Sequence, residues 1–138
     1  LEGNVEQTEA TLRQALDLEP ENVDALKLLS NLLITEGRAE EADEFIARLP
    51  EGEALPADAY LNPGIDLYNQ GDLDGALAKF EEAAASHPDE ALVYYYRGLV
   101  HVAKGQNERA AADFNKLLEL EPEGEKAVEA KEFLQYLQ

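Results

Sequence analysis

The residue types that most often do chemistry are sparse in this chain, and their spacing matches no catalytic or metal-binding pattern. There is no cysteine, which excludes disulfides, thiolate nucleophiles and cysteine-type zinc sites. Asp72 and Asp74 begin a predicted helix and lack the loop spacing of a calcium site. Neither Ser30 nor Ser86 lies in a nucleophile-elbow motif, and no glycine-rich phosphate loop is present. We therefore predict that the chain is not an enzyme and needs no cofactor or metal.

The charge is strongly acidic, with 30 Asp and Glu against 11 Lys and Arg and a net charge of −19. Because phosphate contacts need a basic surface, we exclude nucleic acid as a direct partner. Three interpretations of the charge remain open: a solvated helical surface, attraction of a basic partner, or adaptation to high salt. No apolar run approaches the roughly 20 residues of a membrane span, so no membrane insertion is predicted.

The spacing of the remaining residues predicts helices in a regular repeat. The stretch 91–124 carries aromatic, small and turn-forming residues at fixed offsets, namely Tyr94, Gly98, Gly105, Ala110, Phe114 and Pro122. Small residues let two helices cross closely, the aromatics fill the space between them, and Gly105 ends the first helix. Each buried aromatic is expected to stabilise the fold by about 1.5–3 kcal/mol.

The same spacing recurs without a gap in the two preceding stretches. Residues 57–90 contain Tyr60, Gly64, Gly71, Ala76, Phe80 and Pro88, and residues 23–56 contain Leu26, Gly37, Ala42 and Ile46, with Ser30 at the small position. This pattern resembles the tetratricopeptide repeat, a helix–turn–helix unit of 34 residues. The resemblance implies an all-α fold, a right-handed α-solenoid in which each unit packs on its neighbours.

We predict a single domain over residues 1–138. It comprises the second half of a truncated repeat at 3–22, full repeats at 23–56, 57–90 and 91–124, and an amphipathic capping helix at 125–138. Gly3 is expected at a turn, and the apolar side of the capping helix is expected to contain Ala127, Val128, Ala130, Leu134 and Leu137. A half-repeat cannot cover its own apolar side. We therefore expect Val5 and Leu12 to be covered by an upstream part of a longer protein or by a second copy of the chain, as in a homodimer through the N-terminal end.

The local sequence predicts two helix starts and one helix that contains a proline. Asn22 and Asp72 are expected to cap the N-termini of their helices. Helices are expected at 22–36 and 38–49, followed by a loop over 50–56. Pro63 falls inside a predicted helix, so the helix either kinks there or begins late, with Asn62 as its cap.

The resemblance also implies a binding surface. In similar proteins the first helix of each unit lines a concave groove that binds a peptide or a partner helix. The groove residues implied here are Lys27, Asn31, Leu61, Asn62, Ile65, Tyr68, Asn69, Tyr95, Leu99 and Val102. Tyr68 and Tyr95 are predicted anchors for a partner's apolar side chains; the alternative is that the apolar members cover an adjacent helix or the C-terminal capping helix.

Three positions depart from what the resemblance implies. Some relatives hold a chaperone's C-terminal carboxylate with five side chains, and Lys27, Asn31 and Asn62 match the first three. Leu92 and Tyr96 stand at the two basic positions, so such a clamp is disfavoured. His101 replaces a core aromatic, and we predict a buried packing role, with a ligand role as the alternative. We conclude that the chain is a protein-interaction scaffold or adaptor of a bacterial protein, with self-assembly or regulation of a lost upstream domain as alternatives.

Overall fold

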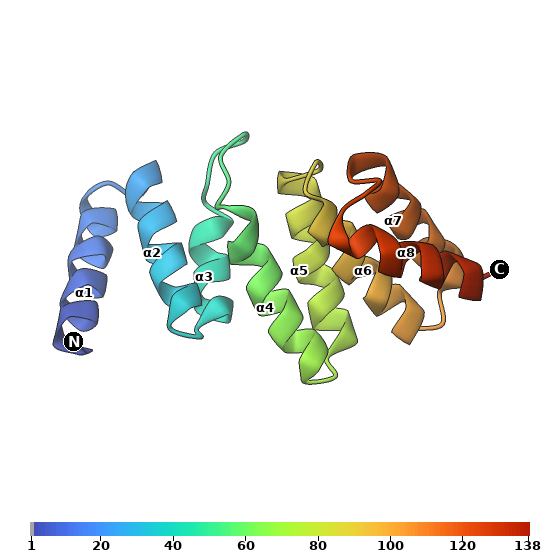
Figure 1. Ribbon diagram of the computed structural model, residues 1–138. Coiled ribbons are helices and arrows are strands. Elements are labelled where there is room, and N and C mark those ends of the chain that lie inside the picture. The colour runs from blue at the N-terminus through green and yellow to red at the C-terminus, as the bar shows by residue number, and fades with distance from the viewer. Residues whose placement is uncertain (1) are drawn as a thin grey trace. The chain divides into compact units, whose positions relative to one another are not determined.

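The computed structural model describes residues 2–138, in which all regular structure is helical (Figure 1). Leu1, the first residue of the predicted domain, lies outside the described residues. The chain divides into two compact units, Leu1–Ala59 and Tyr60–Gln138. The finer division into repeats of 34 residues stays a prediction.

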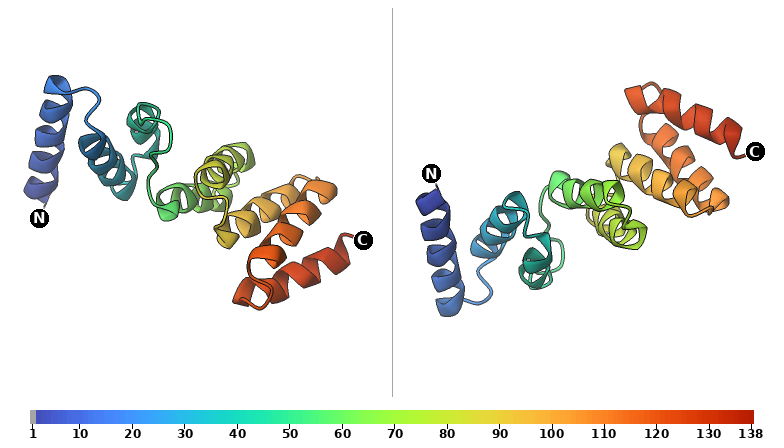
Figure 2. Two further views of the ribbon diagram at one scale, coloured as in Figure 1. Left: turned by 90° about the horizontal axis from the view of Figure 1, so that it is seen from above. Right: turned by 90° about the horizontal axis from the view of Figure 1, so that it is seen from below.

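The first unit is built from α1 (Glu2–Leu18), α2 (Val23–Thr35) and α3 (Ala39–Ile46). The middle helix, α2, packs against both α1 and α3, and the three lie side by side in the views of Figures 1 and 2. The core of the unit consists of the buried residues Leu16, Ala25, Leu26, Leu29, Leu33, Ala42 and Phe45. All three helices contribute to this core.

The ends of these helices follow local capping rules. The Asn22 side chain accepts a hydrogen bond from the Ala25 amide at 2.9 Å, which confirms the predicted N-cap of α2. Gly37 follows α2 with φ of +77°, a conformation that favours glycine. Gly3, which was expected at a turn, instead lies inside α1. That expectation was wrong because the helix already begins at Glu2.

The third helix differs from its prediction in length and in its core residue. It ends at Ile46, before the expected Leu49, and Phe45 is the buried aromatic, while Ile46 is only half-buried. The guanidinium groups of Arg13 and Arg48 lie 5.4 and 5.6 Å from the centre of the Phe45 ring. Cation–π contact therefore closes this end of the core.

The second unit contains most of α4 (Ala57–Asn69), with α5 (Leu73–Ser86), α6 (Ala91–Ala103), α7 (Asn107–Leu120) and α8 (Glu125–Tyr136). In this unit α6 packs against α5 and α7, and α8 packs on α7 with a smaller contact to α6. The core around α6 to α8 contains Ala91, Tyr94, Tyr95, Ala110, Phe114, Leu117, Ala127 and Ala130. Asp72 caps α5 by accepting a hydrogen bond from the Gly75 amide, as predicted.

Helix pairs in this unit are brought close by glycines that face phenylalanines. A Cβ atom added at Gly64 would lie 2.6 Å from Phe80 Cε1, and one added at Gly98 would lie 2.8 Å from Phe114 Cε1. Both phenylalanines are fully buried. Glycine at these two positions therefore leaves free the space that the phenylalanine ring occupies.

Pro63 lies inside α4, which begins at Ala57. The late start that placed Asn62 as a cap was therefore wrong, and the helix continues through the proline. Since proline has no amide hydrogen, this turn of α4 lacks one backbone hydrogen bond.

The C-terminal helix is amphipathic, and its apolar side departs from the expected one only at Val128, since Leu134 and Leu137 pack against the core as expected. Ala127 and Ala130 are buried as predicted, but Val128 is 61 % exposed, which contradicts its assignment. Phe133 takes the inward position instead, and its ring stacks on that of Phe114 with centroids 4.9 Å apart. No helix within residues 2–138 is long and apolar enough to cross a membrane.

Candidate partner-binding surface

The predicted surface residues of α4 lie on one side of that helix. Leu61, Asn62, Ile65, Tyr68 and Asn69 are spaced by about one and two helical turns, which places them on a common face. Asn62 and Asn69 are exposed, and Ile65 and Tyr68 are half-buried. Leu61 is only 3 % exposed, so its prediction as a solvent-facing contact was wrong. Four of the five residues thus reach solvent.

Tyr68 differs from the core tyrosines in its hydrogen bonding. The Tyr94 hydroxyl donates to the Pro88 carbonyl oxygen at 2.7 Å, and the Tyr95 hydroxyl donates to Glu129. The Tyr68 hydroxyl has no hydrogen-bond partner among residues 2–138. A half-buried ring with a free hydroxyl suits contact with another molecule.

On α6, the structure buries the predicted anchor Tyr95. It is 6 % exposed, and α8 supplies both of its polar contacts: the Glu129 carboxylate and the Lys126 ammonium, which lies 4.6 Å from the ring centre. Burial, followed by the hydrogen bond to Glu129, raises the pKa of Tyr95 to about 12. The prediction of Tyr95 as an exposed anchor was therefore wrong, because the C-terminal helix covers it.

The two other predicted groove residues on α6 are neither buried nor fully exposed. Leu99 and Val102 are half-buried and pack against the core of α6 to α8. They follow Tyr95 by about one and two helical turns, so they share its side of the helix. Only parts of these two side chains are therefore available to a partner.

On α2, the predicted residues are polar and one is already engaged. Asn31 is exposed, whereas the Lys27 ammonium forms an ion pair with Glu53 in the loop after α3. Lys27 is thus partly neutralised. This adds to the absence of basic side chains at Leu92 and Tyr96 as an argument against a carboxylate clamp.

The N-terminal helix is held by its own chain. Leu12 packs against the core of the first unit, next to α2, and Val5 is half-buried. Its own chain thus covers only part of Leu12, and the expectation that an upstream segment or a second copy covers Val5 and Leu12 stays a prediction. Among the large apolar side chains described on α1, Leu18 at its C-terminal end is exposed.

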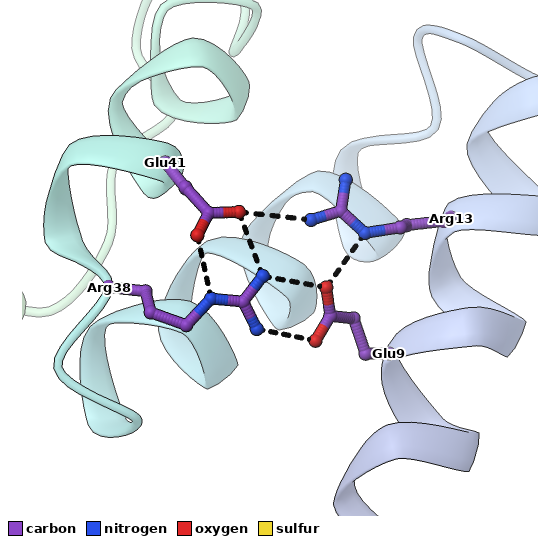
Figure 3. Close-up of polar contacts among 4 residues, drawn as sticks. All are labelled: Glu9, Arg13, Arg38 and Glu41. Carbon is purple, nitrogen blue, oxygen red and sulfur yellow. Dashed lines mark hydrogen bonds and ion pairs between the residues drawn. The ribbon is translucent and has the colours of Figure 1, made fainter.

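Four charged side chains tie α1 to the start of α3, and sequence reasoning missed them (Figure 3). Arg38 donates to Glu9 at 2.7 and 3.1 Å and to Glu41 at 2.7 and 2.8 Å. Arg13 donates to Glu9 at 2.8 Å and reaches Glu41 at 3.5 Å. The helical spacing of Glu9 with Arg13 and of Arg38 with Glu41 was a visible signal for each half of this network.

The network lowers the pKa of its two carboxyl groups. Hydrogen bonds from Arg38 and then from Arg13 lower the pKa of Glu9 from 4.5 to about 2. The hydrogen bond from Arg38 is also the main cause of the lowered pKa of Glu41. Both groups are therefore held in the charged form, in which they accept these bonds.

The predicted packing role of His101 is confirmed. It is 5 % exposed, its Nδ1 lies 2.8 Å from Gln106 Oε1, and its Nε2 lies 3.6 Å from Asp113. Arg97 makes a bidentate contact with the same Asp113, at 3.0 and 2.7 Å for the closest oxygen of each nitrogen. In the described part of the chain, no group of three or more His, Cys, Asp or Glu side chains could hold a metal ion.

A hollow on α8 was also missed from the sequence. It has a volume of about 450 Å³ and is lined by Glu129, Glu132, Phe133 and Tyr136. Tyr136 is 82 % exposed. The spacing of these residues places them on one side of the helix, a pattern that an amphipathicity analysis based on aliphatic residues overlooks.

The repeat spacing, the glycine–phenylalanine pairs and the serial packing of helices agree with comparisons to known families. Two models described as tetratricopeptide repeat match residues 61–125 and 1–61. The chain belongs to the tetratricopeptide repeat family. The predicted fold class, an all-α solenoid of tetratricopeptide repeats, is confirmed. Repeats of this family are generally non-catalytic and mediate interactions between proteins.

Among curated proteins, the chain is similar to the type IV pilus assembly protein PilF of Pseudomonas aeruginosa. The two are 30 % identical over 120 residues, which cover 86 % of this chain and 48 % of PilF. A bovine DnaJ homolog, subfamily C member 3, is 34 % identical over 69 residues, or 50 % of this chain and 14 % of that protein. The chain thus spans half or less of these relatives.

Solved structures share the fold over nearly the whole chain. MamA superposes with a TM-score of 0.63 at 21 % identity, covering 99 % of this chain and 88 % of MamA. YrrB, a tetratricopeptide repeat protein with an unusual peptide-binding site, superposes with a TM-score of 0.61 at 25 % identity, covering 95 % of this chain and 68 % of YrrB. The likeness to MamA concerns the fold alone.

Proposed function

We propose that this chain is a non-catalytic interaction module that binds a peptide or helix of a partner protein through the exposed side of its first helices. In the second unit, the surface comprises Asn62, Ile65, Tyr68 and Asn69 on α4, with the accessible parts of Leu99 and Val102 on α6. In the first unit, Asn31 and Lys27 on α2 are the corresponding positions. Leu61 and Tyr95 are excluded because they are buried.

The exposure and the hydrogen bonding of Tyr68 are the main support for this proposal. Its ring is half-exposed, its hydroxyl is unpartnered among the described residues, and exposed asparagines stand on either side of it on the same helix. A partner backbone could bond to the asparagine amides and the hydroxyl while its apolar side chains cover the ring. The peptide-binding site of YrrB is a precedent for peptide recognition on a similar repeat array.

The proposal is tested by affinity capture from a lysate of the source organism with three baits. They are the unaltered chain, Tyr68→Ala, and Leu18→Ala as a control at an exposed apolar side chain on α1. We expect a protein that is retained by the unaltered chain and by Leu18→Ala but lost with Tyr68→Ala. Circular dichroism is used to verify that all three baits are equally helical.

Hydrogen exchange on the captured complex then locates the contact. Slower exchange of the amides of residues 62–69 supports binding at α4. If capture is equal for Tyr68→Ala and the unaltered chain, the α4 surface is not the site. Sedimentation of the purified chain alone tests self-association, the alternative function, for which a concentration-dependent mass would be the evidence.

A further inference from the structure

The hollow on α8 combines aromatic rings with carboxylates. Phe133 is fixed by stacking on Phe114, and Tyr136 is almost fully exposed one turn further along the same side of the helix. Glu129 and Glu132 line the same hollow. Aromatic faces and carboxylates both attract cations, so both kinds of lining side chain favour a positively charged ligand.

The neighbouring turn of α8 already uses this chemistry within the chain. The Lys126 ammonium lies over the Tyr95 ring and donates to Glu129 Oε1 at 2.9 Å. One ring and one carboxylate thus hold a cation at the edge of the hollow. Glu132 and Tyr136 repeat this combination farther along the helix, without a cation of their own.

Of the two carboxylates that line the hollow, Glu132 is the one without a partner among the described residues. Glu129 is occupied by Tyr95 and Lys126, whereas Glu132 is exposed and has no hydrogen bond or ion pair with any residue in the range 2–138. A cation placed between Glu132 and the Tyr136 ring would therefore displace no existing partner.

We propose that this hollow binds an arginine side chain in a basic segment of a partner protein. A guanidinium group is planar, stacks on aromatic rings and bonds to carboxylates in a fork, so it fits this lining better than an ammonium. The net charge of −19 adds long-range attraction for a basic segment. The volume of about 450 Å³ leaves room for the side chain together with an apolar neighbour against Phe133.

This site lies apart from the α4 surface, and it rests on the proposed function only in assuming that the partner is a protein. The probe is a capped pentapeptide with arginine between two leucines, and its control peptide carries citrulline, the neutral analogue of arginine. Binding is followed by chemical-shift changes in the ¹⁵N-labelled chain. We expect saturable shifts centred on residues 129–136 with the arginine peptide and none with the citrulline peptide.

Four variants locate the contact. Glu132→Gln and Tyr136→Ala are each expected to weaken binding by about two- to fivefold, the size of exposed ion-pair and cation–π contacts. Glu6→Gln, which makes the same charge change on the exposed side of α1, should leave the affinity unchanged. Tyr68→Ala should also leave it unchanged, which separates this site from the α4 surface.

Three outcomes would overturn the inference. Shifts that spread over the acidic surface and respond equally to Glu6→Gln and Glu132→Gln would indicate unspecific charge attraction. Equal binding of the citrulline peptide would indicate an apolar contact without a role for the cation. Shifts of residues 129–136 that grow with protein concentration in the absence of peptide, and vanish with Tyr136→Ala, would show that a second copy of the chain occupies the hollow.

Discussion

Glycine and phenylalanine act as matched pairs across the helices of the second unit. Phe114 fills the space beside Gly98, and its ring also stacks on the ring of Phe133. An added methyl group would therefore meet a ring that already packs against a second aromatic. The small residue is needed for packing, although glycine is a poor helix former.

We predict that Gly98→Ala destabilises the chain by about 1–2 kcal/mol, because overpacking outweighs the gain in helix propensity of about 1 kcal/mol. The matched control is Gly3→Ala in α1, where nothing lies within 4 Å of the added Cβ. The control should be neutral or slightly stabilising. Urea unfolding followed by circular dichroism measures both changes, and a stabilised Gly98→Ala variant would contradict the packing argument.

At the scale of the element, α1 is attached by a core contact and by the ion network. Leu12 and Leu16 pack toward α2, and Glu9 binds Arg38 at the start of α3. The network therefore joins two helices that are separated along the chain by α2. Because its carboxylates must be ionised to accept these bonds, the attachment of α1 depends on pH.

We predict that the Glu9 contribution is present above about pH 4.5 and is lost as the pH falls toward 2. The sign follows from the pKa of Glu9, which is lowered in the folded state from 4.5 to about 2, so protonation favours the unfolded chain. Between about pH 6 and pH 3, the urea midpoint should fall more for the unaltered chain than for Glu9→Gln.

The control for this experiment is Glu6→Gln on the same helix, since Glu6 has no ion pair within the described residues. Its pH dependence should follow that of the unaltered chain. Equal slopes for all three proteins would mean that the network does not contribute to stability.

At the scale of the whole molecule, the dominant physical property is excess negative charge. With 30 carboxylates and 11 Lys and Arg side chains, most carboxylates have no cation to pair with. Folding brings these charges closer together than they are in the unfolded chain, so self-repulsion opposes the folded state. Local ion pairs such as those of Arg38 offset only part of this repulsion.

We predict that raising NaCl from about 20 mM to about 500 mM stabilises the chain by about 1 kcal/mol, or roughly 4 °C in Tm, because salt screens the repulsion. Differential scanning calorimetry gives the Tm, and a neutral osmolyte at equal osmolality serves as the control. A lower Tm at high salt would show that the screened ion pairs matter more than the repulsion.

Local patterns in the sequence determined the helices, their caps and the pairs that pack between them. The caps at Asn22 and Asp72, the turn glycines and the glycine–phenylalanine pairs depend on residues close in the chain or at a fixed repeat offset, so spacing alone predicts them. Helix face also follows from spacing, which is why Ile65, Tyr68 and Asn69 can be assigned to one side of α4. Their role in binding a partner stays a prediction.

Only the tertiary structure decided which of these faces remain open. Tyr95 and Tyr68 were both predicted anchors on the first helix of their repeats, but α8 covers Tyr95, whereas the Tyr68 hydroxyl has no partner among the described residues. Likewise, Arg38 reaches Glu9 across the first unit. Burial and ion pairing at these sites depend on where a neighbouring helix lies, and its position is set by the packing of many side chains together rather than by any one segment.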